Sequence, residues 1–563
     1  MAIKNHPFFI FLFVFYIFMS FSPEIAHAGS YLSTITGGNW VVLQESIGIS
    51  AMHMQVLRNN KVIMFDRTDF GRSNLSLPDG ECRYKDEVVR PKDCTAHAVL
   101  YDIASNTFRP LMVQTDTWCS SGSLDSSGNL IQTGGYKAGE AVIRSFTPCD
   151  DDSCDWVELT NQVLWNRRWY ASNQLLPDGR IIIVGGRRAF TYEFYPKNPQ
   201  ERDNFTLPFL IHTRDRQEEI NLYPFLHLLP DGNLFIFANN RSISLDYKRN
   251  KVIKEYPVMP VGDRRNYPCT GSSVLLPLRL TGITNVTDHP EAEVMICGGA
   301  QKGAYIKSNY LHIYEQASRT CGRLKVTDPK PEWVMELMPI PRIMNDMLLL
   351  PTGDLIIING ATNGSAGWND AMNPVYNPVL YQPDEDPTRR FVVLSSSKIA
   401  RLYHSTAALL PDGRILVGGS NPHQGYNMTG KPYPTELSLE AFYLHYLDPQ
   451  YSYLRPSILT VELSDDRAVL YGEIFSVTFV CSSYRLDLGV SVTVIAPSFT
   501  THSFGMNQRM VVLNVLSVVQ LSMFAYKANV IGPINVNVAP PGYYMLFVVH
   551  AGIPSNAVWV NVC

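Results

Sequence analysis

Residues 175–186, LLPDGRIIIVGG, contain the pattern that decides the fold of this chain. Two apolar runs flank the turn Pro177-Asp178-Gly179, and the pair Gly185-Gly186 follows the second run. Asp-Gly pairs tolerate the positive φ angles of a tight turn between two antiparallel strands. The stretch therefore predicts a β-hairpin that ends in a Gly-Gly mark.

The same pattern recurs along the chain at spacings of 51 to 61 residues. The copies read SLDSSGNLIQTGG, LLPDGNLFIFANN, the interrupted LLPLRL…EVMICGG, LLPTGDLIIING and LLPDGRILVGG, and a degenerate copy, MQVLRNNKVIMFD, has Asn60 at its turn. Hairpin repeats of this length predict an all-β, kelch-like β-propeller, in which each blade is a four-stranded sheet. Seven copies predict seven blades. A tandem of β-sandwiches is the alternative, but sandwiches do not repeat one hairpin at a fixed phase.

The repeat ends near residue 445, and a different β pattern follows it. Runs such as FSVTFVC, VSVTVIAP and GYYMLFVVH alternate with Pro/Gly turns, as in an immunoglobulin-like sandwich. We therefore expect a propeller over 29–450 and an immunoglobulin-like domain over 451–563. The run 40–57 is expected to close the ring against the last blade.

The first 28 residues resemble a secretory signal peptide. Lys4 precedes an apolar run over 8–21, and Ala-His-Ala ends at Ala28. A membrane anchor is the alternative, but the run is short for a bilayer span, and no later segment has about 18 uninterrupted apolar residues. We expect a secreted, soluble protein.

Composition excludes other classes. Hydrophobic residues make up 45% and charged residues 17%, with a net charge of -4 and no basic run, so neither disorder nor nucleic-acid binding is expected. Secretion agrees with glycosylation sequons at Asn74, Asn204, Asn240, Asn285, Asn363 and Asn427. Ten cysteines also suit an oxidising compartment. The expected pairs are Cys82–Cys94, Cys149–Cys154, Cys481–Cys563 and Cys269–Cys321, with Cys297 as a buried thiol and Cys119 without a partner.

The repeat also predicts which residues face the central channel. Cys119 lies nine residues before Gly128, Tyr170 nine before Gly179, and His404 nine before Gly413, directly after Tyr403. These positions begin the first strand of three different hairpins, so their side chains are expected to converge. Polar residues that merely rim a channel are the alternative reading.

The nine-residue spacing to the turn glycine does not by itself define which residues form the site. Tyr223 lies nine residues before Gly232 and fits equally well. Adjacent strand residues also point to opposite faces, so Tyr403 and His404 reach one centre only if the chain bends there.

Four phrases in this order resemble the copper radical oxidases, most closely the plant glyoxal oxidase-like proteins. They are WCSSGS around Cys119, RRWYAS around Tyr170, RLYHST around Tyr403-His404, and SFTTHSF around His502. The resemblance covers nearly the whole chain after residue 28. It implies that a thioether joins Cys119 to Tyr170 as a radical cofactor, and that Tyr170, Tyr403, His404 and His502 bind copper with Tyr403 as the base. By the same resemblance, Tyr223 is not a ligand.

The resemblance further implies oxidation of small aldehydes, of the glyoxal or methylglyoxal type, by O2 with release of H2O2. Phenolates and imidazoles suit Cu(II), and the radical supplies the second electron hole. His502 belongs to the C-terminal domain, so that domain is expected to send a loop up the channel. We expect an extracellular monomer in the apoplast or cell wall, whose H2O2 peroxidases use.

Departures from galactose oxidase, a member of the resembled family, favour small aldehydes over galactose. The tryptophan that shields its radical would follow Gly186, where this chain has Arg187 and Arg188. Trp118, Trp169 and Trp368 are the candidates to replace it. The arginines suit a polarised carbonyl or an acidic product, with a surface salt bridge as the alternative. Two other functions stay open, a carbohydrate alcohol oxidase acting on wall polysaccharides and a non-catalytic propeller that binds glycans or proteins.

Overall fold

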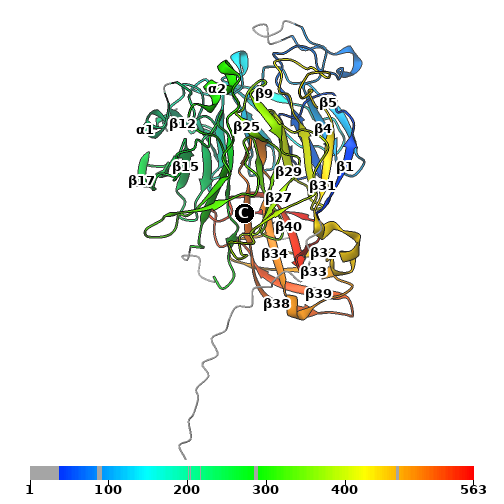
Figure 1. The fold of residues 1–563 in the computed structure, drawn as a ribbon. Helices are drawn as coiled ribbons and strands as arrows, with labels where there is room; N and C mark the ends of the chain where they lie inside the picture. Colours follow the sequence, from blue (N-terminus) through cyan, green and yellow to red (C-terminus); the bar gives the residue numbers. More distant parts are fainter. Residues whose placement is uncertain are drawn as a thin grey trace, which may run out of the picture.

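The computed structural model describes residues 37–563 except 85–91, 201, 203, 216, 284–288 and 464–467. The predicted signal peptide and Asn285 lie outside these residues. The described chain is almost entirely β, with a ring of sheets above and a smaller β domain below (Figure 1).

Seven sheets form the blades of the propeller in the described chain. Blade one contains β2 (His53–Val56), β3 (Lys61–Phe65), β4 (Ala98–Asp102) and β5 (Thr107–Leu111); blade two contains β6 (Ser121–Leu124), β7 (Leu130–Thr133), β8 (Val142–Phe146) and β9 (Val157–Val163). Blade three contains β10 (Ala171–Leu175), β11 (Ile181–Gly185), β12 (Thr191–Tyr195) and β13 (Phe205–Thr206); blade four contains β14 (Phe225–Leu228), β15 (Leu234–Ala238), β16 (Arg241–Asp246) and β17 (Lys251–Glu255). Blade five contains β18 (Gly271–Leu275), β20 (Glu293–Gly298), β21 (Thr320–Lys325) and β22 (Trp333–Leu337); blade six contains β23 (Asp346–Leu349), β24 (Leu355–Ile358), β27 (Val379–Tyr381) and β28 (Phe391–Val393). Blade seven contains β29 (Ser405–Leu409), β30 (Ile415–Gly419), β31 (Leu439–Tyr443) and β1 (Asn39–Gln44).

The hairpin that contains residues 175–186 shows how each blade is built. In blade three, β10 pairs antiparallel with β11, and the turn between them is closed by Gly179 N–H donating to Leu176 O over 3.0 Å. Gly179 has a φ of 80°, in the left-handed region that favours glycine. The predicted hairpin is therefore present, and seven blades are confirmed.

The Gly-Gly mark is explained by a buried arginine at the interface between neighbouring blades. A Cβ on Gly134 would lie 2.3 Å from Arg168 O, so only glycine fits there. The Arg168 guanidinium donates to Gly185 O over 2.6 Å, and Arg401 donates to Gly419 O over 2.9 Å. Both arginines are buried, and each also pairs with a buried glutamate on its own blade.

The ring closes through the N-terminal strand. β1 pairs antiparallel with β31, with Trp40 opposite Phe442. The first part of the run 40–57 thus closes the ring as expected, while its last part forms β2 and begins blade one.

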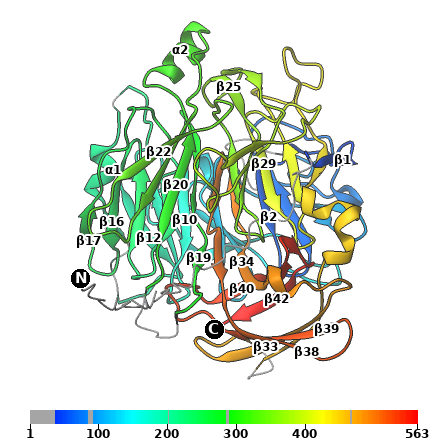
Figure 2. The same ribbon diagram turned by 60° about the horizontal axis from the view of Figure 1, so that its bottom comes forward.

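The C-terminal domain is a two-sheet sandwich below the propeller (Figure 2). One sheet contains β32 (Ser457–Glu462), β33 (Ile474–Val480), β39 (Ala525–Ile531) and β38 (Asn514–Gln520). The other contains β34 (Val490–Ala496), β37 (Arg509–Val512), β40 (Gly542–His550), β41 (Ile553–Pro554) and β42 (Val558–Val562), joined by β19 (Leu278–Arg279). β19 comes from the interruption in the blade-five repeat, which thereby ties the propeller to the sandwich.

The sandwich also sends a hairpin into the propeller, seen in orange in the centre of the ring (Figures 1 and 2). Its strands β35 (Phe499–Thr501) and β36 (Phe504–Met506) extend the sheet of blade one through β2. Phe499, Phe504 and Met506 are completely buried. Each such side chain contributes about 2 kcal/mol of burial free energy, so the hairpin is firmly held in the channel.

Two of the four expected disulfide pairs are present, Cys82–Cys94 and Cys149–Cys154. The expectations for Cys269, Cys297 and Cys321 were wrong. Cys297 pairs with Cys321 because the two lie directly opposite each other on β20 and β21, and Cys269 is a buried free thiol. Cys481 and Cys563 were expected to pair, but both are free.

Candidate metal centre

The channel-facing residues lie in left-handed bends just before the inner strands. The φ angles are 53° at Cys119, 68° at Tyr170, 49° at Tyr223 and 65° at His404. β6, β10, β14 and β29 begin only after these residues, so the expectation that they begin the strands was wrong by one or two positions. The bend at His404 places its ring 3.8 Å from that of Tyr403, which removes the difficulty of opposite strand faces.

Backbone hydrogen bonds between these bends hold neighbouring blades at one height. Tyr170 N–H donates to Cys119 O over 2.9 Å, and Tyr223 N–H donates to Tyr170 O over 3.0 Å. The repeat phase therefore corresponds to a chain of backbone contacts that runs from blade two through blade three to blade four.

His502 enters this ring from the C-terminal domain. It lies at the tip of the β35–β36 hairpin, and it and Ser503 both have positive φ angles, as in the two-residue turns that match strand twist. Thr501 pairs with His53 of β2, and its hydroxyl lies 2.7 Å from His502 Nδ1. The hairpin register thus fixes the height and orientation of the His502 ring.

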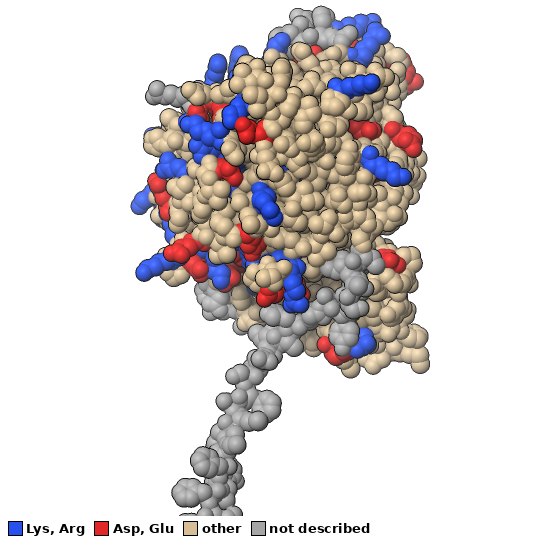
Figure 3. All heavy atoms as spheres, viewed as in Figure 1, with Lys and Arg blue, Asp and Glu red and all other residues tan. Residues whose placement is uncertain are grey.

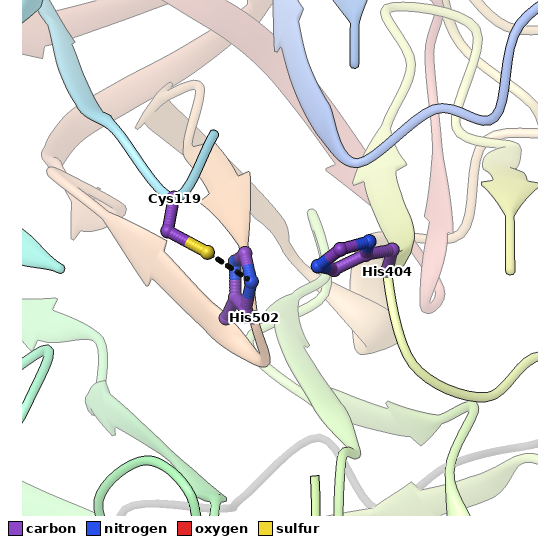
Figure 4. Close-up of side chains that lie close together, drawn as sticks. All are labelled: Cys119, His404 and His502. Carbon is purple, nitrogen blue, oxygen red and sulfur yellow. Dashed lines mark hydrogen bonds between the residues drawn. The ribbon is translucent and has the colours of Figure 1, made fainter. Parts of the chain in front are cut away.

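Three potential ligand atoms meet inside the channel (Figure 4). The metal-binding atoms of Cys119, His404 and His502 all lie within 4.8 Å of one another, and all three residues are buried. Cys119 Sγ is 3.1 Å from His502 Nε2. Both ring nitrogens of His404 are buried without a hydrogen-bond partner among the described residues. Buried polar atoms are usually satisfied, so this imidazole fits a metal ligand.

Tyr170 and Tyr403 complete the cluster, and Tyr267 lies between them. The Tyr403 hydroxyl is 2.8 Å from the Tyr267 hydroxyl, which accepts a 3.4 Å hydrogen bond from Tyr170. The rings of Tyr170 and Tyr267 stack at 4.6 Å. The structure thus brings all five predicted residues of the site together.

Sequence reasoning missed Tyr267 because the blade-five hairpin has no Gly turn from which to count. A different signal was present. The buried Arg168, Arg265 and Arg401 each precede a channel tyrosine by two residues, and Arg265 leads to Tyr267. The pattern Arg-x-Tyr would have found it.

Burial sets the protonation states of the cluster. It raises the pKa of the Tyr170 and Tyr403 phenols well above the usual value and lowers the pKa of the His404 and His502 imidazoles well below it. Burial also raises the pKa of the Cys119 thiol, and a hydrogen bond with Tyr170 partly opposes the rise. Neutral imidazoles can bind a metal directly, whereas the phenols would become anions only beside a cation.

The donor set of two imidazoles and two phenols suits Cu(II). Tyr223 matched the repeat phase but is placed differently, since its hydroxyl donates to Ser120 O over 3.0 Å. Its ring lies 5.0 Å from that of His502 and helps to enclose it.

Of the three candidate tryptophans, Trp169 lies against Tyr170. Their ring centroids are 4.6 Å apart. Trp118 packs against Trp169 at 4.9 Å, and Trp368 stacks on Trp118 at 5.5 Å, so both are more distant from Tyr170 in this chain of contacts. Tyr170 is thus covered by Trp169 and Tyr267.

A cleft of about 420 Å³ opens onto Tyr170 and Tyr267. It is lined by loops of blades three to five and by α2 (Ala304–Leu311), which stands at the end of the propeller away from the sandwich (Figures 1 and 2). Arg187 forms a salt bridge of 3.0 Å with Glu219, which is the alternative role expected for the pair Arg187 and Arg188. Arg188 and Arg214 also line the cleft.

The sequons differ in accessibility. Asn74 and Asn427 are exposed, whereas Asn204, Asn240 and Asn363 are half-buried. The Asn363 amide donates to Tyr314 O over 3.2 Å.

The part of the chain that the structure describes contains no helix long and apolar enough to cross a membrane.

Comparison with known proteins gives consistent matches. The family described as "Glyoxal oxidase N-terminus" matches residues 52–446, and "Galactose oxidase-like, Early set domain" matches 455–562. The chain is 45% identical to "Aldehyde oxidase GLOX" of Vitis pseudoreticulata, over 93% of this chain and 97% of that protein. It is 43% identical to "Aldehyde oxidase GLOX1" of Arabidopsis thaliana, over 93% and 84%.

Among solved structures, a fungal alcohol oxidase of the AA5 family in complex with copper superimposes with a TM-score of 0.70. The match covers 94% of this chain and all of that chain at 18% identity. At this identity the likeness supports the fold, a propeller with a C-terminal sandwich.

Proposed function

This chain belongs to the glyoxal oxidase family, and from that premise we propose that it is a copper-dependent aldehyde oxidase with a protein-derived radical cofactor. It oxidises simple aldehydes of the glyoxal or methylglyoxal type to carboxylic acids and reduces O2 to H2O2. The observation that carries the proposal is the buried imidazole of His404, whose two nitrogens have no partner among the described residues and which faces His502 and Tyr403.

Tyr170, Tyr403, His404 and His502 would hold the copper. When bound, copper supplies one of the two oxidising equivalents and stabilises the phenolate forms of its ligands. The second equivalent is a radical on Tyr170, joined through a thioether to Cys119. The buried cluster excludes bulk water, which protects such a radical.

The side chains divide the chemistry of a hydrated aldehyde, RCH(OH)2. Tyr403 accepts a proton from one hydroxyl, and Tyr170 removes the hydrogen atom from the C–H bond. The two protons and two electrons removed from the hydrate pass to O2, so the products are RCOOH and H2O2. Tyr267 hydrogen-bonds to the Tyr403 hydroxyl and lines the cleft, so it offers a path along which this proton moves between Tyr403 and the cleft.

We also propose that the protein is secreted as a monomer to the extracellular space, with 1–28 removed, and that peroxidases use its H2O2. The leader sequence, two exposed sequons and three disulfides support this location.

A peroxide-coupled substrate screen on copper-loaded protein tests the proposal. Methylglyoxal and glyoxal should give H2O2, galactose should give little, and the His404→Ala variant should give none. Comparable yields from galactose and methylglyoxal would favour a carbohydrate alcohol oxidase. Absence of peroxide with every substrate, together with absence of copper, would favour a binding protein.

A further inference from the structure

The cleft above Tyr170 and Tyr267 is larger than a glyoxal-sized substrate requires. Its volume of about 420 Å³ lies in the range of pockets that enclose much larger ligands. Since Tyr170 and Tyr267 line it, a molecule in the cleft reaches the radical side of the site. Tyr305 and Tyr310 of α2 form part of its wall.

The acidic side chains in this cleft already have partners. Glu218 accepts hydrogen bonds from Gly303 N–H at 3.0 Å and Ile306 N–H at 3.4 Å, near the start of α2. Glu219 accepts from Arg187 at 3.0 Å. The guanidinium of Arg187 also lies over the Trp169 ring at 5.3 Å, so contacts with the cleft wall fix its position.

Arg188 and Arg214 differ from Arg187. Among the described residues, neither has a carboxylate within 4.0 Å. The Arg214 guanidinium lies over the Phe190 ring at 5.2 Å, which supports its orientation, and the nearby Asp215 is paired with Lys302 at 3.0 Å. The cleft therefore carries two guanidinium groups without a carboxylate partner. Figure 3 shows Lys and Arg side chains at the upper left, over the region of α1 (Pro208–His212) and α2, with Asp and Glu side chains among them.

We propose that Arg188 and Arg214 form a subsite for a carboxylate, so that the preferred substrates are aldehydes with a carboxylate at the far end of the molecule. This inference rests on the proposed aldehyde oxidase function and names its substrate class. A guanidinium binds a carboxylate through two parallel N–H···O bonds, which orients the ligand as well as attracting it. With its carboxylate held at the arginines, the aldehyde end can extend towards Tyr170.

The test compares succinic semialdehyde with butanal, which has the same number of carbon atoms but no charge. We expect copper-loaded protein to have the higher kcat/KM for succinic semialdehyde. The ratio of the two values should fall about tenfold in Arg188→Met and in Arg214→Met, the factor associated with one charge-assisted hydrogen bond. Arg188→Lys and Arg214→Lys keep the charge and should recover most of the ratio. Arg249→Met, at a highly exposed arginine of blade four, is the matched control and should keep the wild-type ratio.

A binding measurement separates this inference from the proposed function. Succinate is titrated calorimetrically into wild-type protein and into the Arg188→Met/Arg214→Met double variant at low salt. Binding by the wild type that the double variant loses supports the subsite, even if neither aldehyde is oxidised. Equal succinate binding by both proteins, or an unchanged kcat/KM ratio in the double variant of an active enzyme, would overturn it.

Discussion

The Nε2 atom of His502 lies 3.1 Å from Sγ of Cys119, although 383 residues separate them in the sequence. Cys119 belongs to blade two and His502 to the C-terminal domain. The site is therefore complete only when the β35–β36 hairpin occupies the channel. Metal binding, which adds ligand bonds to His502, should couple the stability of the two domains.

We predict that each histidine of the cluster is needed for copper binding. His404→Ala and His502→Ala should each lower copper affinity at least about tenfold, because each removes one of the two imidazole ligands of the site. Metal analysis of purified, copper-treated protein measures this. His445→Gln changes a buried histidine outside the cluster and should retain copper. Wild-type copper content in both alanine variants would refute the assignment.

Tyr267 should act as a positioning residue between Tyr170 and Tyr403. Tyr267→Phe keeps the stacked ring but removes the 2.8 Å hydrogen bond to Tyr403. We expect kcat to fall roughly tenfold or more with little change in KM, and the pH–rate profile to shift, because the Tyr403 proton loses its path. Tyr223→Phe removes a hydroxyl bonded to the backbone and serves as the control. Equal kinetics and pH profiles in Tyr267→Phe and the wild type would contradict this role.

Trp169 should protect the oxidised form of Tyr170. The ring contact at 4.6 Å is an aromatic pair, which contributes about 0.5–1.5 kcal/mol, so its loss should shorten the lifetime of oxidised Tyr170 roughly two- to tenfold. The measurement is the decay of first-turnover activity after the oxidant is removed, in Trp169→Leu against the wild type. Trp118→Leu should have a smaller effect, since Trp118 contacts Trp169. A larger effect of Trp118→Leu would transfer the protective role to Trp118.

Stability should fall as pH rises from about 4 to about 8, partly through Asp346 of β23. Burial raises the pKa of Asp346 to about 8, although a hydrogen bond from Asn359 opposes the rise. The folded state then holds a proton that the unfolded state has lost between pH 4 and 8, so stability falls with rising pH by at most about 1.4 kcal/mol per unit for this group. Denaturant titrations at pH 6 and 8 should show a smaller decline in Asp346→Asn than in the wild type. Equal losses of stability in Asp346→Asn and in the wild type would show that other groups cause the pH dependence.

Much of the fold could be predicted because the hairpin repeat is local. Each turn lies within a dozen residues of the strands it joins, and its Gly-Gly pair marks a contact with the neighbouring blade. The same nine-residue spacing to the turn glycine predicted that Cys119, Tyr170 and His404 lie at one level along the channel axis. The bend that lets Tyr403 and His404 share a face was not predictable, since nothing in the residue types requires a φ of 65° at His404.

Features that depend on distant register could not be derived from the repeat. His502 was identified only through family resemblance, because its height depends on the pairing of β35 with β2. The Cys297–Cys321 disulfide was missed because α2 and its loops separate β20 from β21 in the sequence. The residues of β20 that lie opposite those of β21 could therefore not be predicted. Tyr267 was missed where the blade-five turn is replaced by the strand that joins the sandwich.

We predict, finally, that Cys119 and Tyr170 become covalently linked in the mature, copper-loaded enzyme. Cys119 is a buried free thiol, and the backbone hydrogen bond from Tyr170 N–H to Cys119 O fixes the two segments side by side. A thioether ortho to the phenol oxygen would hold the Tyr170 ring and lower its oxidation potential. Peptide mass spectrometry under reducing conditions should reveal a cross-linked pair that is two hydrogens lighter than the separate peptides, and only in copper-treated protein. Cys119→Ser should keep most of its copper but lose turnover at least about a hundredfold, which corresponds to about 2.7 kcal/mol of transition-state stabilisation. A reducible or free Cys119 in fully active, copper-loaded enzyme would refute the radical mechanism, because an unmodified tyrosine at this position lacks the substituent that makes its oxidation accessible.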